Sequence, residues 1–195
     1  MQFQDVQYAG GAGALGDVVK LEPAPGKGLI AVKDMSHFTI SSSDSTKSNQ
    51  FYKDLFGFGT RSYQGPTAPT LAIGPTVEFL MFTGGGGAAR GGAAATPPPP
   101  PRPASINHSC MNLENFNVEQ VQKALESVGI KPREGAAGPV GPMRHYVSMR
   151  MENRGGAKEG TPELYFTDPD GLLIQLQDVS YCGGGGYLGN VCPAL

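Results

Sequence analysis

The sequence carries little charge, and this limits the partners it can have. Charged residues make up 16% of the 195 residues and the formal net charge is -2, so nothing attracts the chain to nucleic acid or to an anionic membrane surface. No apolar run approaches the roughly 18 residues that span a bilayer. The N-terminus lacks a basic segment followed by an apolar one, so no secretory signal is visible. We expect a cytoplasmic protein, or a periplasmic or secreted one if a signal has been removed.

Cysteines are also few. Three cysteines cannot all pair with one another, and their spacings do not resemble a zinc-binding CxxC pair. Cys110 lies in an apolar, strand-like run and is expected to be a buried thiol. Cys182 and Cys192 bracket a glycine-rich loop, which a disulfide would close in an oxidising compartment; two free thiols are the alternative.

Glycine and proline are abundant, with 29 and 17 copies, and they predict long irregular segments. Residues 11–16 match the dinucleotide-binding spacing GxGxxG, but no buried strand precedes them, so we interpret residues 1–33 as an arm over the core. Residues 84–104 are low in complexity and include consecutive prolines at 97–101, which predicts a flexible linker ending in a stiff polyproline II spacer. A proline-rich ligand for a partner domain is the alternative.

Residues 161–178 give the clearest structural signal. Apolar runs at 164–166 and 172–174 flank an Asp-Pro-Asp-Gly turn at 168–171, which predicts a β-hairpin. The second arm alternates strictly, with Leu173, Gln175 and Gln177 on one face and Leu172, Ile174 and Leu176 on the other. The apolar set would pack under helices, and the glutamines would face a wet or metal-bearing cavity; a half-exposed strand is the alternative. Glu163, in the first arm, shares a face with Tyr165 and Thr167 and is expected in a salt bridge at the rim; a position inside the cavity is the alternative.

The rest of the pattern is a strand, a helix and three strands, and it occurs twice. The first copy has strands at 37–40, 58–63, 70–73 and 76–82 and a helix at 47–56, whose buried face should carry Phe51, Leu55 and Phe56. The second copy has strands at 107–113, 146–151 and the two hairpin arms, and a helix at 118–128 with Val121, Leu125 and Val128 on its apolar face.

The spacing within the two copies indicates an internal repeat. A histidine opens each copy and a glycine ends each helix: His37 precedes Gly57 by 20 positions, and His108 precedes Gly129 by 21.

This repeat, together with the FTDPDGLLIQL hairpin, resembles the vicinal oxygen chelate superfamily, which includes glyoxalase I, extradiol dioxygenases, fosfomycin-resistance enzymes and bleomycin-binding proteins. The resemblance implies an α+β fold in which two βαβββ modules form a cup-shaped, half-barrel mixed sheet with helices outside. It assigns the modules to residues 34–83 and 105–180, with an insertion at 135–160 that is a candidate lid, and leaves residues 181–195 as a glycine-rich tail.

In that family the metal ligands come from the first and last strands of the modules. The resemblance therefore implies His37, Glu78, His108 and Gln175 as the ligands. Two imidazoles and a carboxylate leave adjacent positions open for a bidentate substrate. The third histidine, His145, has no counterpart in the other module, and we interpret it as lid or solvent-facing, with a supporting or substrate-contacting catalytic role as the alternative.

Gln175 departs from the glutamate that the family usually has there. A neutral amide binds metal more weakly and cannot be a general base, so Glu78 would have to take over proton transfer. We expect a mononuclear enzyme with Fe(II), or alternatively Mn, Ni or Zn, acting on a small, anionic substrate through two vicinal oxygens. Two histidines and one carboxylate favour a dioxygenase. The alternatives are a glyoxalase-like isomerase or lyase, and a metal-free binding or resistance protein; a homodimer is left open.

Overall fold

The computed structural model describes residues 26–64, 68–84, 103–136, 138–181 and 183, which form a nine-stranded mixed sheet with two α-helices. The strands are β1 (Val32–Ser41), β2 (Thr60–Tyr63), β3 (Pro69–Ala72), β4 (Phe79–Thr83), β5 (Ser105–Leu113), β6 (Lys131–Pro132), β7 (Arg144–Arg150), β8 (Thr161–Thr167) and β9 (Leu173–Asp178). The helices are α1 (Ser45–Phe56) and α2 (Val118–Ser127), with a 3-10 turn, η1 (Glu152–Arg154).

The sheet consists of two copies of one unit. The order β2-β3-β4-β1-β5-β9-β8-β7-β6 contains β2-β3-β4-β1 from the first module and its counterpart β7-β8-β9-β5 from the second. The last strand of each module lies parallel to the first, β4 beside β1 and β9 beside β5. This confirms the expected α+β fold, with paired βαβββ modules in an unclosed sheet.

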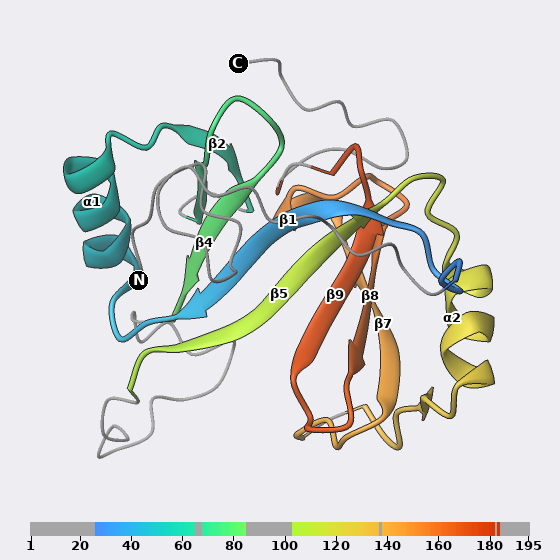
Figure 1. Cartoon of the computed structure of the whole chain (residues 1–195). Coiled ribbons are helices and arrows are strands. Elements are labelled where there is room, and N and C mark those ends of the chain that lie inside the picture. Colours follow the sequence, from blue (N-terminus) through green and yellow to red (C-terminus); the bar gives the residue numbers. More distant parts are fainter. Residues whose placement is uncertain (1–25, 65–67, 85–102, 137, 182, 184–195) are drawn as a thin grey trace, which may run out of the picture.

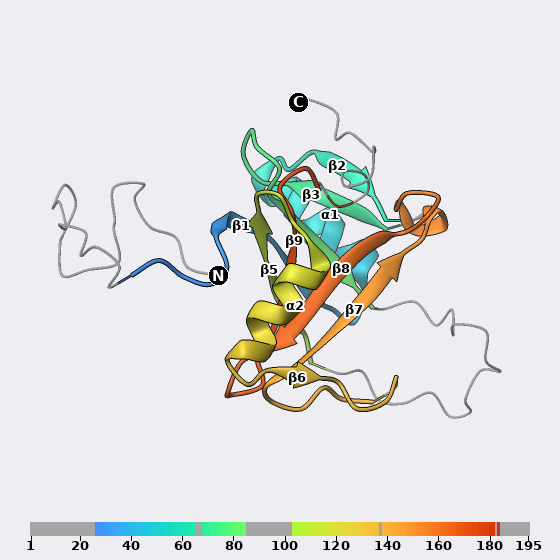
Figure 2. The same ribbon diagram turned by 90° about the vertical axis from the view of Figure 1, so that its right-hand side faces the viewer.

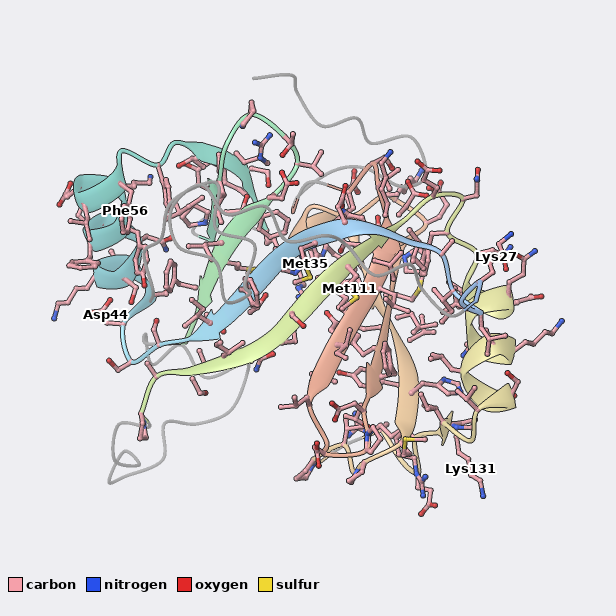
Figure 3. The ribbon with its side chains drawn as sticks, viewed as in Figure 1. Lys27, Met35, Asp44, Phe56, Met111 and Lys131 are labelled. Atoms are coloured by element: carbon pink, nitrogen blue, oxygen red, sulfur yellow. The ribbon has the colours of Figure 1, made fainter. Side chains whose placement is uncertain are left out.

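The two modules meet where β1 and β5 pair in antiparallel fashion. Figure 1 shows these long strands side by side across the middle of the molecule, with α1 and α2 at opposite ends. Met35 and Met111 are partners in this register, and Figure 3 shows them close together at the centre. A single sheet therefore continues from one module into the other.

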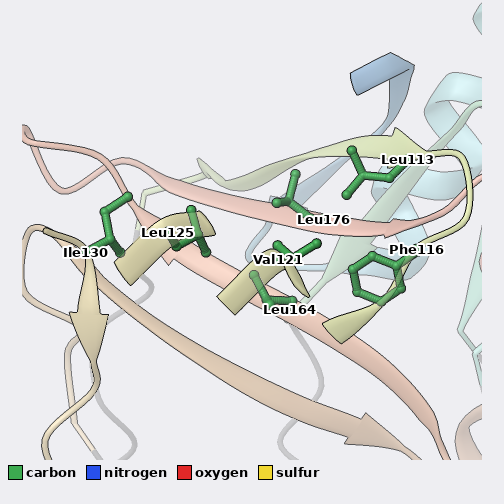
Figure 4. Packing of buried hydrophobic residues seen from close by; sticks show 7 residues of the cluster. All are labelled: Leu113, Phe116, Val121, Leu125, Ile130, Leu164 and Leu176. Atoms are coloured by element: carbon green, nitrogen blue, oxygen red, sulfur yellow. The ribbon is translucent and has the colours of Figure 1, made fainter. Parts of the chain in front are cut away.

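The larger apolar core lies under α2. Figure 2 shows this helix lying across the second half of the sheet. The buried residues that pack there, shown in Figure 4, are Leu113, Phe116, Val121, Leu125, Ile130, Leu164 and Leu176. Ile174 packs against the same cluster, whereas Gln175 lines a cavity and Gln177 is buried among polar side chains. The predicted alternation is confirmed along β9, but Leu172 lies just before the strand and is 65% exposed, so its expected packing under a helix is wrong.

Helix α1 ends at the expected glycine and begins two residues earlier than expected, at Ser45. Asp44 is the N-cap, its carboxylate accepting from the Lys47 backbone N–H at 3.0 Å, and Gly57 ends the helix with φ of 69°.

The buried face of α1 differs from the one predicted. Phe51 and Leu55 are 58% and 56% exposed, so their expected burial is wrong. Tyr52 packs instead against Phe82, with ring centroids 4.8 Å apart, and Phe56 stacks on Phe58 at 5.2 Å. The helix carries two adjacent apolar stripes, and its own periodicity does not determine which one the sheet covers.

Two further expectations need correction. Helix α2 ends at Ser127, and Val128 is its C-cap residue and 52% exposed, so it does not belong to the buried face. The candidate lid cannot extend over the whole of 135–160, because β7, the strand expected at 146–151, lies within it and pairs with β8 from His145 to Arg150.

Some predictions fall outside the described residues: the pairing of Cys182 with Cys192, the GxGxxG spacing at 11–16 and most of the linker at 84–104. Cys110 is buried and unpaired, as expected. Among the residues described, no helix has both the length and the apolar character needed to cross a membrane.

The hairpin offers a matched pair of leucines for testing the core. Leu164 is fully buried and Leu172 is 65% exposed. Leu164→Ala should lower the free energy of unfolding by about 2–5 kcal/mol, because it leaves a cavity under α2. Leu172→Ala should change it by less than about 0.5 kcal/mol. Urea denaturation of both variants measures the difference, and equal effects would contradict this packing.

Candidate functional site

A cavity of about 180 Å³ opens on the sheet face that α2 does not cover. It is lined by His37, Thr39, Gln64, Met81, Thr83, Asn107, His108, Arg150, Arg154, Tyr165 and Gln175. Strands from both modules contribute, and η1 adds its last residue. The structure thus brings three of the four predicted ligands, His37, His108 and Gln175, to one place.

The two histidines reach the cavity from adjacent strands. Their ring centroids are 5.5 Å apart with the planes nearly perpendicular. They are not at equivalent positions of the repeat, because His37 precedes the helix N-cap Asp44 by seven residues and His108 precedes the N-cap Asn117 by nine. A displacement of two residues preserves the face of a strand, so both imidazoles still face the cavity.

Hydrogen bonds determine which nitrogen of His108 faces the cavity. Its Nδ1 lies 2.8 Å from the Oδ1 of Asn107, while the Nδ2 of that amide donates to Ser41 at 3.4 Å. An amide oxygen only accepts, so Nδ1 carries the proton. Nε2 then has a free lone pair, and it is buried with no hydrogen-bond partner among the described residues. This is the tautomer in which imidazole binds a metal.

Both imidazoles are held in the neutral form. Burial lowers the pKa of His37 well below its usual value, and the nearby His108 and Arg150 lower it further. Burial also lowers the pKa of His108 to about 4. His37 is held in place by Ser36, whose Oγ is 3.0 Å from Nδ1, and by stacking on Phe79 with centroids 4.2 Å apart. Neutral, fixed imidazoles are suited to coordinate rather than to donate protons.

Gln175 presents its carbonyl oxygen toward the histidines. Its Nε2 donates to Gln177 Oε1 at 2.9 Å and to Glu163 Oε1 at 3.4 Å. Its Oε1 is buried and has no hydrogen-bond partner among the described residues. Hydrogen bonding of the Gln175 side chain raises the pKa of both imidazoles, against the larger effect of burial. Two unpartnered acceptors, on His108 and Gln175, therefore lie side by side.

A buried ion pair lies beside this group. Arg150 donates to Glu163, and both are less than 4% exposed. The salt bridge expected for Glu163 is therefore present, but in the interior and not at the rim. Burial raises the pKa of Glu163 to about 8, whereas hydrogen bonds with Gln175 and Tyr165 lower it. Burial lowers the pKa of Arg150 to about 10, so the guanidinium is still cationic at neutral pH.

Arg150 and Tyr181 are site residues that the sequence reasoning missed. The guanidinium lies over the Tyr181 ring, 4.6 Å from its centroid, and donates to the Gly183 carbonyl at 3.0 Å. Tyr181 is itself buried near His37, with centroids 6.4 Å apart. Strand alternation could have found Arg150, because it shares a face with Tyr146, which stacks on Tyr165. Tyr181 follows the last strand and carries no such signal.

Glu78 does not join this group. The cavity-facing residues of β4 include Met81 and Thr83, whereas Leu80 and Phe82 pack toward α1. Glu78 lies just before β4, two residues from Leu80 and four from Phe82, so it is on their side of the sheet. Burial lowers the pKa of Arg61 on β2, and the charge of Glu78 raises it. The two-histidine, one-carboxylate set expected from the sequence is therefore not formed with Glu78.

His145 is also elsewhere. It is 1% exposed, and its Nε2 lies 3.2 Å from Glu126 of α2. It lines a separate hollow of about 300 Å³ with Arg133 and Tyr146, and not the cavity that contains His37. The expectation of a lid or solvent position for His145 is wrong, because β7 places its side chain under the helix.

The donor set fits a divalent metal of modest affinity. The described residues contain no group of three His, Cys, Asp or Glu side chains that could hold an ion. The two neutral imidazoles and the amide oxygen are nevertheless all electron-pair donors, and two of them have no hydrogen-bond partner in the described part of the chain. A cation would satisfy both, and nitrogen and oxygen donors of this kind suit Fe(II), Mn, Ni or Zn.

Comparison with protein families matches residues 34–176 to the Glyoxalase/Bleomycin resistance protein/Dioxygenase superfamily. No curated protein sequence matches the chain. Among solved structures, methylmalonyl-CoA epimerase from Mycobacterium tuberculosis is 13% identical, with 81% of this chain and 94% of that one covered and a TM-score of 0.50.

The 2,3-dioxygenase LapB from Pseudomonas sp. KL28 is 12% identical, with 84% of this chain covered and a TM-score of 0.51. The chain spans about half of that dioxygenase, 47% of its length. At these identities the likeness shows the fold. The family match covers most of the chain, and the protein belongs to the Glyoxalase/Bleomycin resistance protein/Dioxygenase superfamily.

The placement of Glu78 gives a direct test of the ligand set. Glu78→Gln should leave the affinity for Mn(II) within about twofold of wild type, because the carboxylate lies on the other face of the sheet. Gln175→Ala, which removes an oxygen that faces the cavity, should weaken it by about tenfold. Calorimetric titration measures the Mn(II) affinity of both variants. A loss of affinity of about tenfold in Glu78→Gln would show that Glu78 is a ligand after all.

Proposed function

We propose that this member of the superfamily is an enzyme that uses one divalent metal to act on a small, anionic substrate with two adjacent oxygen atoms. His37, His108 and Gln175 would hold the metal. The observation that carries the proposal is the pair of unpartnered acceptors, His108 Nε2 and Gln175 Oε1, buried at one cavity. Leaving a buried polar atom unpaired costs about 1–3 kcal/mol, and one bound cation would satisfy both of these acceptors.

The charge of the cavity supports an anionic substrate. Arg150 and Arg154 line it, and none of the described lining residues is acidic. Arg150 is fixed by its contacts with Glu163, Tyr181 and the Gly183 carbonyl, so its charge is pre-positioned. Arg154 is at the exposed end of η1, where it can meet a substrate as it enters. The volume of about 180 Å³ suits a molecule of a few carbon and oxygen atoms.

Among reactions of the family, we favour oxidation by dioxygen over isomerisation. Isomerisation of this type needs a base to remove a proton from carbon. The described lining offers neutral imidazoles as prospective ligands and Tyr165, whose pKa burial raises well above its usual value. Tyr165 is therefore a hydrogen-bond donor to a substrate oxygen and not a base. When bound, Fe(II) would supply Lewis acidity and reactivity toward dioxygen.

Metal-free binding of a small anion is the second candidate. It is favoured by the absence, among the described residues, of a carboxylate that joins the two histidines. Arg150, Arg154 and Tyr165 would then bind the ligand directly, and the free acceptors of His108 and Gln175 would meet its hydroxyl or N–H groups.

Metal binding by the histidines separates the two candidates. His37→Ala and His108→Ala should each weaken Fe(II) and Mn(II) binding by at least about tenfold, because each removes a nitrogen ligand. His145→Ala is the matched control, a buried histidine outside the cavity, and should retain wild-type affinity. Anaerobic titration with each metal gives the result. Absence of stoichiometric binding by the wild type would favour metal-free binding.

Arg154, at the rim of the cavity, should contribute to substrate binding and not to metal binding. Arg154→Ala should weaken binding of 4-nitrocatechol, a chelating catecholate, about three- to tenfold, since an exposed cation contributes modestly. Arg144→Ala, on β7 but outside the cavity lining, is the matched control. Absorption titrations of metal-loaded protein measure this, together with oxygen uptake for the Fe(II) form. Equal loss in both variants would argue against an anion subsite at η1.

A further inference from the structure

We propose that a hydrogen-bond chain, which runs from the Asp34 carboxylate through the buried amides of Asn112 and Gln177, sets which end of the Gln175 amide faces the cavity, making Gln177 a positioning residue. Its consequence for metal binding rests on the proposed function. The orientation itself does not, because it follows from hydrogen bonds outside the cavity.

The chain starts at a group that can only accept. Asp34 Oδ1 accepts from Asn112 Nδ2 at 2.7 Å. Asn112 is fully buried, so its two amide ends have only protein to satisfy them. Because its nitrogen is held by the carboxylate, its Oδ1 is turned the other way, where it accepts from Gln177 Nε2 at 3.4 Å.

The Gln177 amide is oriented in the same way, with its nitrogen toward Asn112 and its oxygen toward Gln175. Its Nε2 also donates to Ser36 Oγ at 2.8 Å, so its nitrogen end has two acceptors. Its Oε1 therefore faces Gln175 and accepts from Nε2 of that residue at 2.9 Å. Glu163 Oε1 takes the second amide hydrogen of Gln175 at 3.4 Å.

The result is a fixed polarity at the cavity. Both donors of Gln175 are committed to Gln177 and Glu163, so only the carbonyl oxygen is left for the side of His37 and His108. Turning over Gln175 or Gln177 alone would bring two amide nitrogens or two oxygens together. Both residues are at most 2% exposed, so water cannot relieve that mismatch.

Gln177 also acts on the other side of the site through Ser36. The Ser36 oxygen accepts from Gln177 and lies 3.0 Å from Nδ1 of His37. A hydroxyl oxygen can accept twice, so it can take the His37 Nδ1 proton as well and leave Nε2 with a lone pair. One glutamine thus orients one ligand directly and supports a second.

Two substitutions of similar size separate orientation from packing. Gln177→Glu keeps an oxygen to accept from Gln175, whereas Gln177→Met removes both polar ends. Gln177→Met should weaken Mn(II) binding about tenfold. Gln177→Glu should weaken it less, by about threefold, because it keeps the acceptor for Gln175 and loses only the donor to Asn112 and Ser36. Equal losses in the two variants would reduce Gln177 to a structural role and overturn the proposal.

A measurement on metal-free protein tests the orientation by itself. In nuclear magnetic resonance spectra the side-chain NH2 of Gln175 should show contacts to residue 177 and slow exchange with water. Gln177→Met should speed that exchange at least about tenfold, because the amide loses its acceptor. Contacts from this NH2 to the His108 ring in wild type would overturn the proposal. Slow exchange and contacts to residue 177, with no Mn(II) binding, would support the orientation and reject the proposed function instead.

Discussion

The antiparallel pairing of β1 with β5 is the constraint on which the site depends. It joins the two modules into one sheet and brings His37 and His108 onto adjacent strands with rings 5.5 Å apart, although they are far apart in sequence. The parallel partner β9 then places Gln175 beside them. Each module alone supplies only part of this set. The site therefore forms only where the two modules meet, and its prospective ligands come from both halves of the chain.

Burial then determines the chemistry of these side chains. Desolvation keeps both imidazoles neutral, and hydrogen bonds to Asn107 and Gln177 turn the free acceptors of His108 and Gln175 inward. Arg150 donates to Glu163, which lies behind the lining, and the guanidinium stays cationic at neutral pH. A neutral donor set beside two arginines leaves the charge of a bound metal uncompensated by carboxylate. That arrangement favours a substrate that brings its own negative charge.

Much of the fold could be read from the sequence, and less of the site. The Asp-Pro-Asp-Gly turn, the strand alternation and the glycines after each helix predict the paired modules. The resemblance to the superfamily implies that His37, His108 and Gln175 share one site. The error at Glu78 is one of register: a shift of a single residue moves a side chain to the opposite face of a strand. The buried stripe of α1 was also beyond prediction, because Phe51 and Tyr52 are both apolar candidates. Arg150 could have been found from the alternation along the strand predicted at 146–151, where it shares a face with Tyr146.

The most direct measurement is an anaerobic titration of Fe(II) and Mn(II) into wild type and Gln175→Glu. If the inward oxygen of Gln175 binds the metal, replacing a neutral amide by a carboxylate of nearly the same shape should tighten binding by about tenfold or more. Turnover or binding of an anionic substrate should weaken in the same variant, because the metal becomes a poorer Lewis acid. Unchanged metal affinity in Gln175→Glu would contradict the account, since it would remove Gln175 from the metal and leave two histidines without a third ligand.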